Sequence, residues 1–216
     1  MSQKRLPPKR TGRSLDWRDV LYATISDVQR LDRVIRYSSI PFSVPEATST
    51  HSFWVTLYSA LICTHLGDSS PPLSEVLLYA VTHDISEAVT GDVVRVLKYS
   101  TPEMKQQVDR SEKILIDKLF PTLLKKITIK PTKKTKIIVK AADFMSLFHF
   151  MRREAARMNL EIIPFYYRML RDMKDESEKV PHWIAGLYRE MMIEAEMVGQ
   201  DCFGKHIGNS RWYREI

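Results

Sequence analysis

The sequence predicts an all-α protein, folded as a single helical domain of about seven helices. Apolar residues recur at helical spacing along most of the chain, and no stretch alternates strictly between apolar and polar residues. Only 7 of the 216 residues are glycine, and stretches containing proline separate the periodic segments. We find no internal repeat, so a solenoid or propeller is not expected.

The chain is expected to begin with a flexible basic arm over residues 1–13, because this stretch is rich in lysine, arginine and proline. A folded domain over residues 14–200 and a C-terminal tail over 201–216 are expected to follow. The first helix is predicted from residue 15 to residue 35. Its apolar face comprises Leu21, Ile25, Val28, Leu31 and Ile35.

The stretch "RYSSIPFSVPEATST" (residues 36–50) contains two prolines and many hydroxyls, which predicts a loop. Thr48 or Ser49 is then expected to cap an apolar helix that runs to Leu66 and stops at Gly67. Residues 68–91 repeat this pattern, with two prolines, an apolar helix and a glycine at the end.

A loop containing "VLKYS" (residues 96–100) is predicted next. The helix over residues 101–120 opens with Thr and Pro, which suit the N-cap and first helical turn. Further helices are expected over residues 137–158, 165–175 and 181–198.

The composition favours a soluble globular protein, since 44% of the residues are hydrophobic and the charge content is ordinary. The longest apolar stretch, from Phe53 to Ile62, is too short to span a bilayer, so we expect no membrane segment. Two cysteines make no disulfide framework, which favours a reducing cytoplasm.

The formal net charge of +7 is concentrated in two runs, one at the N-terminus and one over residues 125–136. A disordered tail and a solvated loop would explain both runs. Alternatively, the runs attract anionic nucleotides or nucleic acid.

Polar residues interrupt three apolar helices in a way that suggests a metal site. His83 and Asp84 are adjacent, so their side chains are expected to point about 100° apart on a helix, with Glu87 on the face of His83. His51 lies in the first turn of another apolar helix, and Asp143 lies in a third, where its polar neighbours are Lys140 and Ser146. Two imidazoles and two carboxylates suit Mn, Co, Fe, Ni or Zn ions. A buried His bonded to an Asp is the structural alternative.

This order of His, His-Asp and a distant Asp on helices resembles the HD superfamily of metal-dependent phosphohydrolases. The stretch "HDISEAVTGDVVRVLKYS" resembles the bacterial 5′-deoxynucleotidases of that superfamily, as does the spacing of fifteen residues from Arg36 to His51. "KAADFMSLF" resembles the last Asp segment of the same group. Small viral dATP triphosphohydrolases are related to this group. The resemblance covers residues 15–158.

The resemblance implies an HD-domain fold, a deoxynucleotide substrate and one role for each matching residue. His51, His83, Asp84 and Asp143 would hold a divalent ion, with Mn, Co or Zn favoured over Mg or Fe. Asp84 would take part in catalysis, and Glu87 would orient or deprotonate the attacking water. The substrate contacts would be Arg36 and Lys98 for phosphate, Tyr37 and Ile40 for base or sugar, and Asp92 for the 3′-hydroxyl.

Two positions depart from that group, which usually has Glu before the first His and Trp after the Arg. Here they are Thr50 and Tyr37. The implied reaction converts a deoxynucleoside monophosphate to deoxynucleoside and phosphate. Release of triphosphate from a deoxynucleoside triphosphate is the alternative reaction. A third hypothesis is a non-catalytic module that binds nucleotide or nucleic acid. A homo-oligomer is implied, nucleic-acid binding is not favoured, and a viral protein would act in the host cytoplasm.

Overall fold

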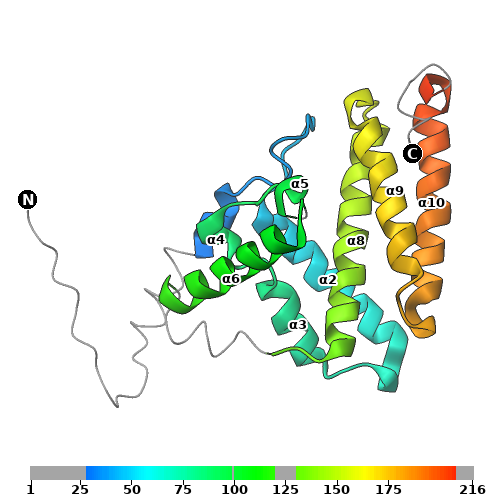
Figure 1. Cartoon of the computed structure of the whole chain (residues 1–216). Helices are drawn as coiled ribbons and strands as arrows, with labels where there is room; N and C mark the ends of the chain where they lie inside the picture. Colours follow the sequence, from blue (N-terminus) through cyan, green and yellow to red (C-terminus); the bar gives the residue numbers. More distant parts are fainter. Residues whose placement is uncertain (1–27, 99, 120–129, 208–216) are drawn as a thin grey trace, which may run out of the picture.

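The computed structural model describes residues 28–98, 100–119 and 130–207, and Figure 1 shows them as a helical bundle with a smaller helical cluster beside it. Within these ranges the all-α prediction is confirmed, because no strand forms and the one β-bridge joins Ile35 to Ala47. The predicted arm over residues 1–13, residues 15–27 of the predicted first helix, residues 125–129 of the basic run and residues 208–216 of the predicted tail lie outside the described residues.

The bundle is formed by α2 (Thr48–Leu66), α3 (Leu73–Thr82), α8 (Lys133–Ala156), α9 (Ile163–Ser177) and α10 (His182–Ile207). Helix α8 runs through the middle, with α2 and α3 packed on one side and α9 and α10 on the other (Figure 1). Their apolar faces meet in one core, which explains why the sequences of these helices are rich in apolar residues. Fully buried members of this core include Val55, Val76, Ile138, Tyr166, Tyr188 and Phe203.

The smaller cluster contains the 3₁₀ helix η1 (Val28–Arg33) and helices α4 (Glu87–Thr90), α5 (Arg95–Lys98) and α6 (Pro102–Leu119). Two further 3₁₀ turns, Gly67–Ser69 and Leu160–Ile162, lie after α2 and before α9. A second, small core joins η1 to the segment around α4. It consists of Leu31, Ile85 and Ala88.

The prediction of one helix to residue 35 is wrong at its end. After Arg33 the chain turns, and Ile35 is 37% exposed rather than buried on a helix face. The backbone N–H of Arg36 donates to the Glu46 carbonyl at 2.9 Å, and that of Thr48 donates to the Val34 carbonyl at 2.9 Å. These bonds close the loop of residues 36–46 and place its first residues beside the start of α2.

The helix predicted through His83 to Gly91 is interrupted. Helix α3 ends at Thr82, and residues 83–86 form a turn that interrupts the helix. The Ile85 N–H donates to the Thr82 carbonyl at 3.2 Å, and the Glu87 N–H donates to the Asp84 carbonyl at 3.0 Å, each three residues back instead of four. Glu87 therefore begins a separate short helix and does not continue the His83 face. Gly91 then ends α4 with φ of 69°, a left-handed value that favours glycine.

Three other boundaries differ from the predictions. Thr48 is the first residue of α2, and Ala47 is at the cap position, with no side-chain capping bond. The loop predicted around residues 96–100 overlaps helix α5. Helix α10 continues to Ile207 and crosses the predicted end of the domain at residue 200.

Candidate functional site

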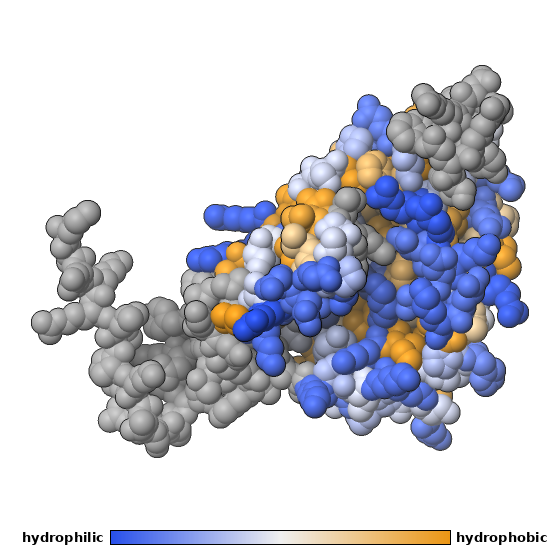
Figure 2. Space-filling model, in the orientation of Figure 1, coloured by the Kyte–Doolittle hydropathy of each residue, from blue (hydrophilic) through white to orange (hydrophobic). Residues whose placement is uncertain are grey.

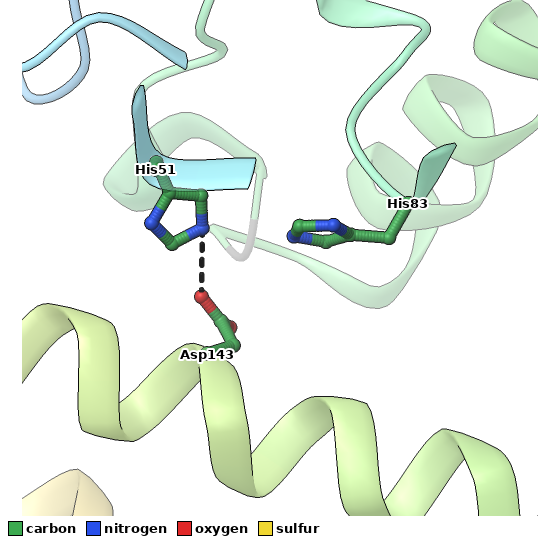
Figure 3. A group of neighbouring side chains, drawn as sticks. All are labelled: His51, His83 and Asp143. Carbon is green, nitrogen blue, oxygen red and sulfur yellow. Dashed lines mark ion pairs between the residues drawn. The ribbon is translucent and has the colours of Figure 1, made fainter. Parts of the chain in front are cut away.

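Three of the four predicted metal ligands meet where α2, the turn after α3 and α8 come together (Figure 3). His51, His83 and Asp143 each offer one ligand atom, and these atoms all lie within 4.8 Å of one another. His51 Nε2 is 3.3 Å from Asp143 Oδ1, the contact dashed in Figure 3. Residues up to 92 positions apart in the chain thus converge on one point.

The fourth predicted ligand, Asp84, borders the same point. Its Oδ2 atom is 3.1 Å from His83 Nε2 and 3.7 Å from His51 Nε2. The same oxygen accepts a hydrogen bond of 2.8 Å from Arg36 Nη1. We call His51, His83 and Asp143 the metal-capable group. Asp84 therefore links this group to Arg36, the first predicted phosphate contact.

In both imidazoles, Nδ1 contacts a polar group of the protein, which fixes the orientation of the ring. His83 Nδ1 lies 2.6 Å from the Ala80 carbonyl oxygen, so this nitrogen donates a proton to that oxygen and Nε2 faces the site. His51 Nδ1 lies 3.0 Å from the Ser146 hydroxyl. Neither Nε2 atom makes a hydrogen bond within the described part of the chain, although both are buried. Buried ring nitrogens that make no hydrogen bond and face two carboxylates fit a divalent ion.

The charged groups of the site shift the pKa values of their neighbours. Burial opposes a charged His83, but the Asp84 carboxylate outweighs it and raises the His83 pKa to about 9. Burial and the Arg36 charge lower the pKa of His51. Although burial opposes its ionisation, Lys140 and His51 hold the pKa of Asp143 well below its usual value. An ion would replace the proton on His83, because a ligating imidazole must be neutral.

Glu87 lies next to this group on α4, and its pKa is raised to about 8 by burial and by the negative charge of Asp84. The Thr48 hydroxyl donates to Glu87 Oε2 at 2.9 Å. Thr48 is fully buried in the first turn of α2, so α2 positions both His51 and the Glu87 carboxylate. A nearby cation would favour the ionised carboxylate.

The predicted substrate residues line one pocket together with Asp84, Glu87 and Asp143. They are Arg36, Tyr37, Ile40, Asp92 and Lys98. Tyr37 has a left-handed φ of 53°, which is uncommon for a bulky residue. Its backbone N–H donates to Asp92 Oδ2 at 2.6 Å, and its hydroxyl accepts from Arg36 Nη2 at 3.1 Å. The Tyr37 ring stacks against Phe150 of α8. Lys98 Nζ is 2.8 Å from Glu112 Oε1 of α6.

Several pocket residues were missed by sequence reasoning. Lys140 was visible only as a polar neighbour of Asp143, yet it lines the pocket and its Nζ is 3.4 Å from Asp143 Oδ2. Phe165 and Arg168 enter from α9, in a region without a motif. Their spacing of three residues on an amphipathic helix indicates a shared face, but does not indicate what that face contacts.

A second buried acid, Glu154, fixes the loop that carries Arg36 and Tyr37. Its carboxylate accepts the Ser43 backbone N–H at 2.7 Å and the Asn159 Nδ2–H at 2.8 Å, both on Oε2. The Ser43 hydroxyl lies 2.8 Å from Oε1. Helix α8 thus positions both Asp143 and the tip of the loop.

Known proteins resemble this chain in family and in fold. A family model described as 5′-deoxynucleotidase YfbR-like matches residues 22–185. A search of curated proteins found no match. None of the described helices is both long and apolar enough to cross a bilayer.

Three solved structures share the fold. Cyanophage S-2L HD phosphohydrolase DatZ, bound to dA and one catalytic Zn²⁺ ion, is 16% identical with a TM-score of 0.55, over 82% of this chain and 96% of its own. An HD-domain phosphohydrolase from Listeria innocua is 17% identical with a TM-score of 0.54, over 90% of this chain and 92% of its own. A protein from Pyrococcus horikoshii is 19% identical with a TM-score of 0.58, over 83% of this chain and 98% of its own.

Proposed function

The chain belongs to the YfbR-like 5′-deoxynucleotidase family of HD-type phosphohydrolases, and we propose that it hydrolyses deoxynucleoside monophosphates to deoxynucleosides and phosphate with a divalent ion. One observation carries the proposal. Two buried imidazole nitrogens without hydrogen-bond partners among the described residues face Asp143, beside a pocket lined by Arg36 and Glu87. A group able to hold a metal ion, beside a pocket that contains an arginine, suits hydrolysis of a phosphate ester.

The ion would be held by His51, His83, Asp84 and Asp143, and when bound it supplies a Lewis acid and lowers the pKa of water. The nitrogen and oxygen donors suit Mn, Co or Zn, with Mg or Fe as further options. DatZ, which shares the fold, binds one catalytic Zn²⁺. Asp84 would contact the ion while it keeps its hydrogen bond to Arg36.

Glu87 would orient the attacking water and accept its proton. The Thr48 hydroxyl holds Oε2 in place, and the carboxylate lines the pocket beside Asp84. The water oxygen bonds to phosphorus, the bond from phosphorus to the 5′ oxygen breaks, and that oxygen takes the proton held by Glu87. Arg36 would offset the charge on the phosphoryl oxygens, since its guanidinium faces Asp84.

The nucleoside would lie against Tyr37 and Ile40. Asp92 accepts the Tyr37 N–H through one oxygen, and a carboxylate has acceptor capacity left for a 3′-hydroxyl. Lys98 lines the pocket but pairs with Glu112, so its contact with phosphate stays a prediction. The homo-oligomer, the cytoplasmic location and the low expectation of nucleic-acid binding stay predictions as well.

The test is release of phosphate from each deoxynucleoside monophosphate in the presence of Mn²⁺, Co²⁺ or Zn²⁺. His83→Ala and Asp84→Ala should abolish hydrolysis and reduce bound metal, whereas His65→Ala, an exposed histidine near the end of α2, should change neither. Unchanged activity and metal content in the first two variants would refute the proposal. Tight nucleotide or DNA binding without any turnover would instead support the non-catalytic module.

A further inference from the structure

A further carboxylate lies behind His51, on the side away from the rest of the metal-capable group. Glu46 Oε2 is 4.0 Å from His51 Nδ1, whereas the nitrogen that faces Asp143 is Nε2. Figure 3 shows the two ring nitrogens pointing in different directions, one toward Asp143 and the other away from it. Glu46 therefore contacts the ring without belonging to the group that would hold the ion.

Glu46 is a buried acid, and one of its oxygens makes no hydrogen bond within the described residues. Hydrophilic residues gather on the surface, as over α9 and α10 in Figure 2, but Glu46 is only 4% exposed. The bare oxygen is Oε2. Oε1 is 3.5 Å from Nη2 of Arg153, whose side chain is half exposed, and such ion pairs contribute little to stability. A buried charge is costly, so Glu46 needs another reason to lie there.

The backbone fixes Glu46 at the junction between the loop of residues 36–46 and α2. Its carbonyl accepts the Arg36 N–H at 2.9 Å, and the carbonyl of the next residue, Ala47, accepts the His51 N–H at 3.1 Å. Adjacent peptide groups thus hold the predicted phosphate contact and a predicted metal ligand. Glu46 is anchored beside His51 by bonds that do not involve its carboxylate.

His51 needs its proton on Nδ1 if Nε2 is to bind an ion. Asp143 Oδ1 and Asp84 Oδ2, at 3.3 and 3.7 Å from Nε2, attract the proton to Nε2 instead, because carboxylates only accept hydrogen bonds. Ser146 does not decide between the two nitrogens, since its hydroxyl, 3.0 Å from Nδ1, can donate or accept. Glu46 is an acceptor on the Nδ1 side. At 4.0 Å it is too far for a hydrogen bond, so it acts through its charge.

We propose that Glu46 is a positioning residue that favours the proton of His51 on Nδ1 and so leaves Nε2 free for the ion. The inference rests on the metal site of the proposed function, and Glu46 acts through His51 without touching substrate. A carboxylate behind a ligating imidazole also strengthens that ligand. Burial raises the pKa of Glu46 to about 6, although Arg36 and Arg153 act to lower it, so the carboxylate is ionised at pH 8.

The experiment measures Zn²⁺ affinity by calorimetry, and the position of the His51 proton in the metal-free protein by ¹⁵N NMR, both at pH 8. Glu46→Gln keeps the shape of the side chain and removes its charge, whereas Glu46→Asp keeps the charge. Glu194→Gln is the matched control, because Glu194 is an exposed acid on α10 that pairs with the neighbouring Arg152 at 2.7 Å. Arg153→Gln separates a role of Glu46 through His51 from a role through Arg153.

Glu46→Gln should bind Zn²⁺ about tenfold more weakly than the wild type, and a larger fraction of its His51 should carry the proton on Nε2. Glu46→Asp should lie between these two proteins. Glu194→Gln and Arg153→Gln should bind Zn²⁺ as the wild type does. The melting temperature of metal-free Glu46→Gln should not fall, because the change removes a buried charge whose Oε2 makes no hydrogen bond with a described residue.

Equal Zn²⁺ affinities, or equal positions of the His51 proton, in Glu46→Gln and the wild type would overturn the proposal. The same weakening in Arg153→Gln would overturn it too, because Glu46 would then act by holding α8. Loss of the fold in Glu46→Gln would show a structural role instead. None of these measurements needs turnover, so a failure of the proposed function, seen as no phosphate release by the Zn²⁺-loaded protein, is detected separately.

Discussion

Removing the Glu154 carboxylate should loosen the loop that carries Arg36 and Tyr37. Glu154 has 0% exposure and accepts hydrogen bonds from the Ser43 N–H, the Ser43 hydroxyl and Asn159 Nδ2. At a net value of about 1 kcal/mol for each bond, Glu154→Ala should lower the free energy of unfolding by about 3 kcal/mol. For a chain of this length, that is a fall of about 10 °C in melting temperature. Glu154→Gln keeps the shape and part of the bonding, so we expect about 1 kcal/mol.

The same change should alter how stability depends on pH. Burial opposes ionisation of Glu154, but the hydrogen bonds from Asn159 and Ser43 outweigh it and lower its pKa. A lowered pKa in the folded state stabilises the protein above the unfolded pKa, and this stabilisation is lost as pH falls through the folded pKa. The wild type should therefore lose more stability on acidification than Glu154→Gln.

The measurement is urea unfolding of the wild type, Glu154→Ala and Glu154→Gln at neutral and acidic pH, with steady-state kinetics beside it. Glu178→Gln, an exposed residue after α9, is the control. A higher KM in the Glu154 variants would link the loop to substrate binding. Glu154→Ala within about 0.5 kcal/mol of the wild type, or parallel pH profiles for the wild type and Glu154→Gln, would refute the reasoning.

Three further predictions concern the metal and the attacking water. Thr48→Val removes the hydroxyl that holds Glu87, so kcat should fall about tenfold while the metal content stays constant; a loss of metal would contradict a role through Glu87 alone. Ser146→Ala removes the partner of His51 Nδ1, so metal titration should show binding that is about 10- to 100-fold weaker. An unchanged metal affinity would mean that Ser146 contributes only to packing. Chelation should abolish hydrolysis and lower the melting temperature. Metal added at about 100 times its Kd should restore about 2.7 kcal/mol to the free energy of unfolding. Equal melting curves with and without metal would show that the protein holds no ion.

Helix positions were predicted well where periodicity and turn residues agreed. Helix α2 ends at Leu66 before Gly67, as expected. Gly67 has φ of 53°, a left-handed value that glycine adopts easily and that ends the helix. The interruption after Thr82 was not predicted, since His83 to Ser86 keep residue types that fit a helix. Tertiary context routinely overrides local propensity, and local patterns do not contain it.

The candidate site likewise has features that the sequence predicted and features that it did not. Residue type and spacing identified His51, His83, Asp84 and Asp143, because polar groups within apolar helices need a reason to be buried. The pairing of Arg36 with Asp84 was not predicted, because it joins residues 48 positions apart in the chain. The roles of these residues stay predictions until the variants are measured.

By itself, the sequence determined the helical class and the resemblance to HD phosphohydrolases and predicted the residues that would hold an ion, because these depend on residue type, on spacing along the chain and on helical periodicity. Only the tertiary structure decided that the Glu46 carboxylate lies behind His51 and that Glu87 leaves the helix of His83. Those outcomes depend on how α2, α3 and α8 pack against one another, and packing joins residues that are distant in the chain.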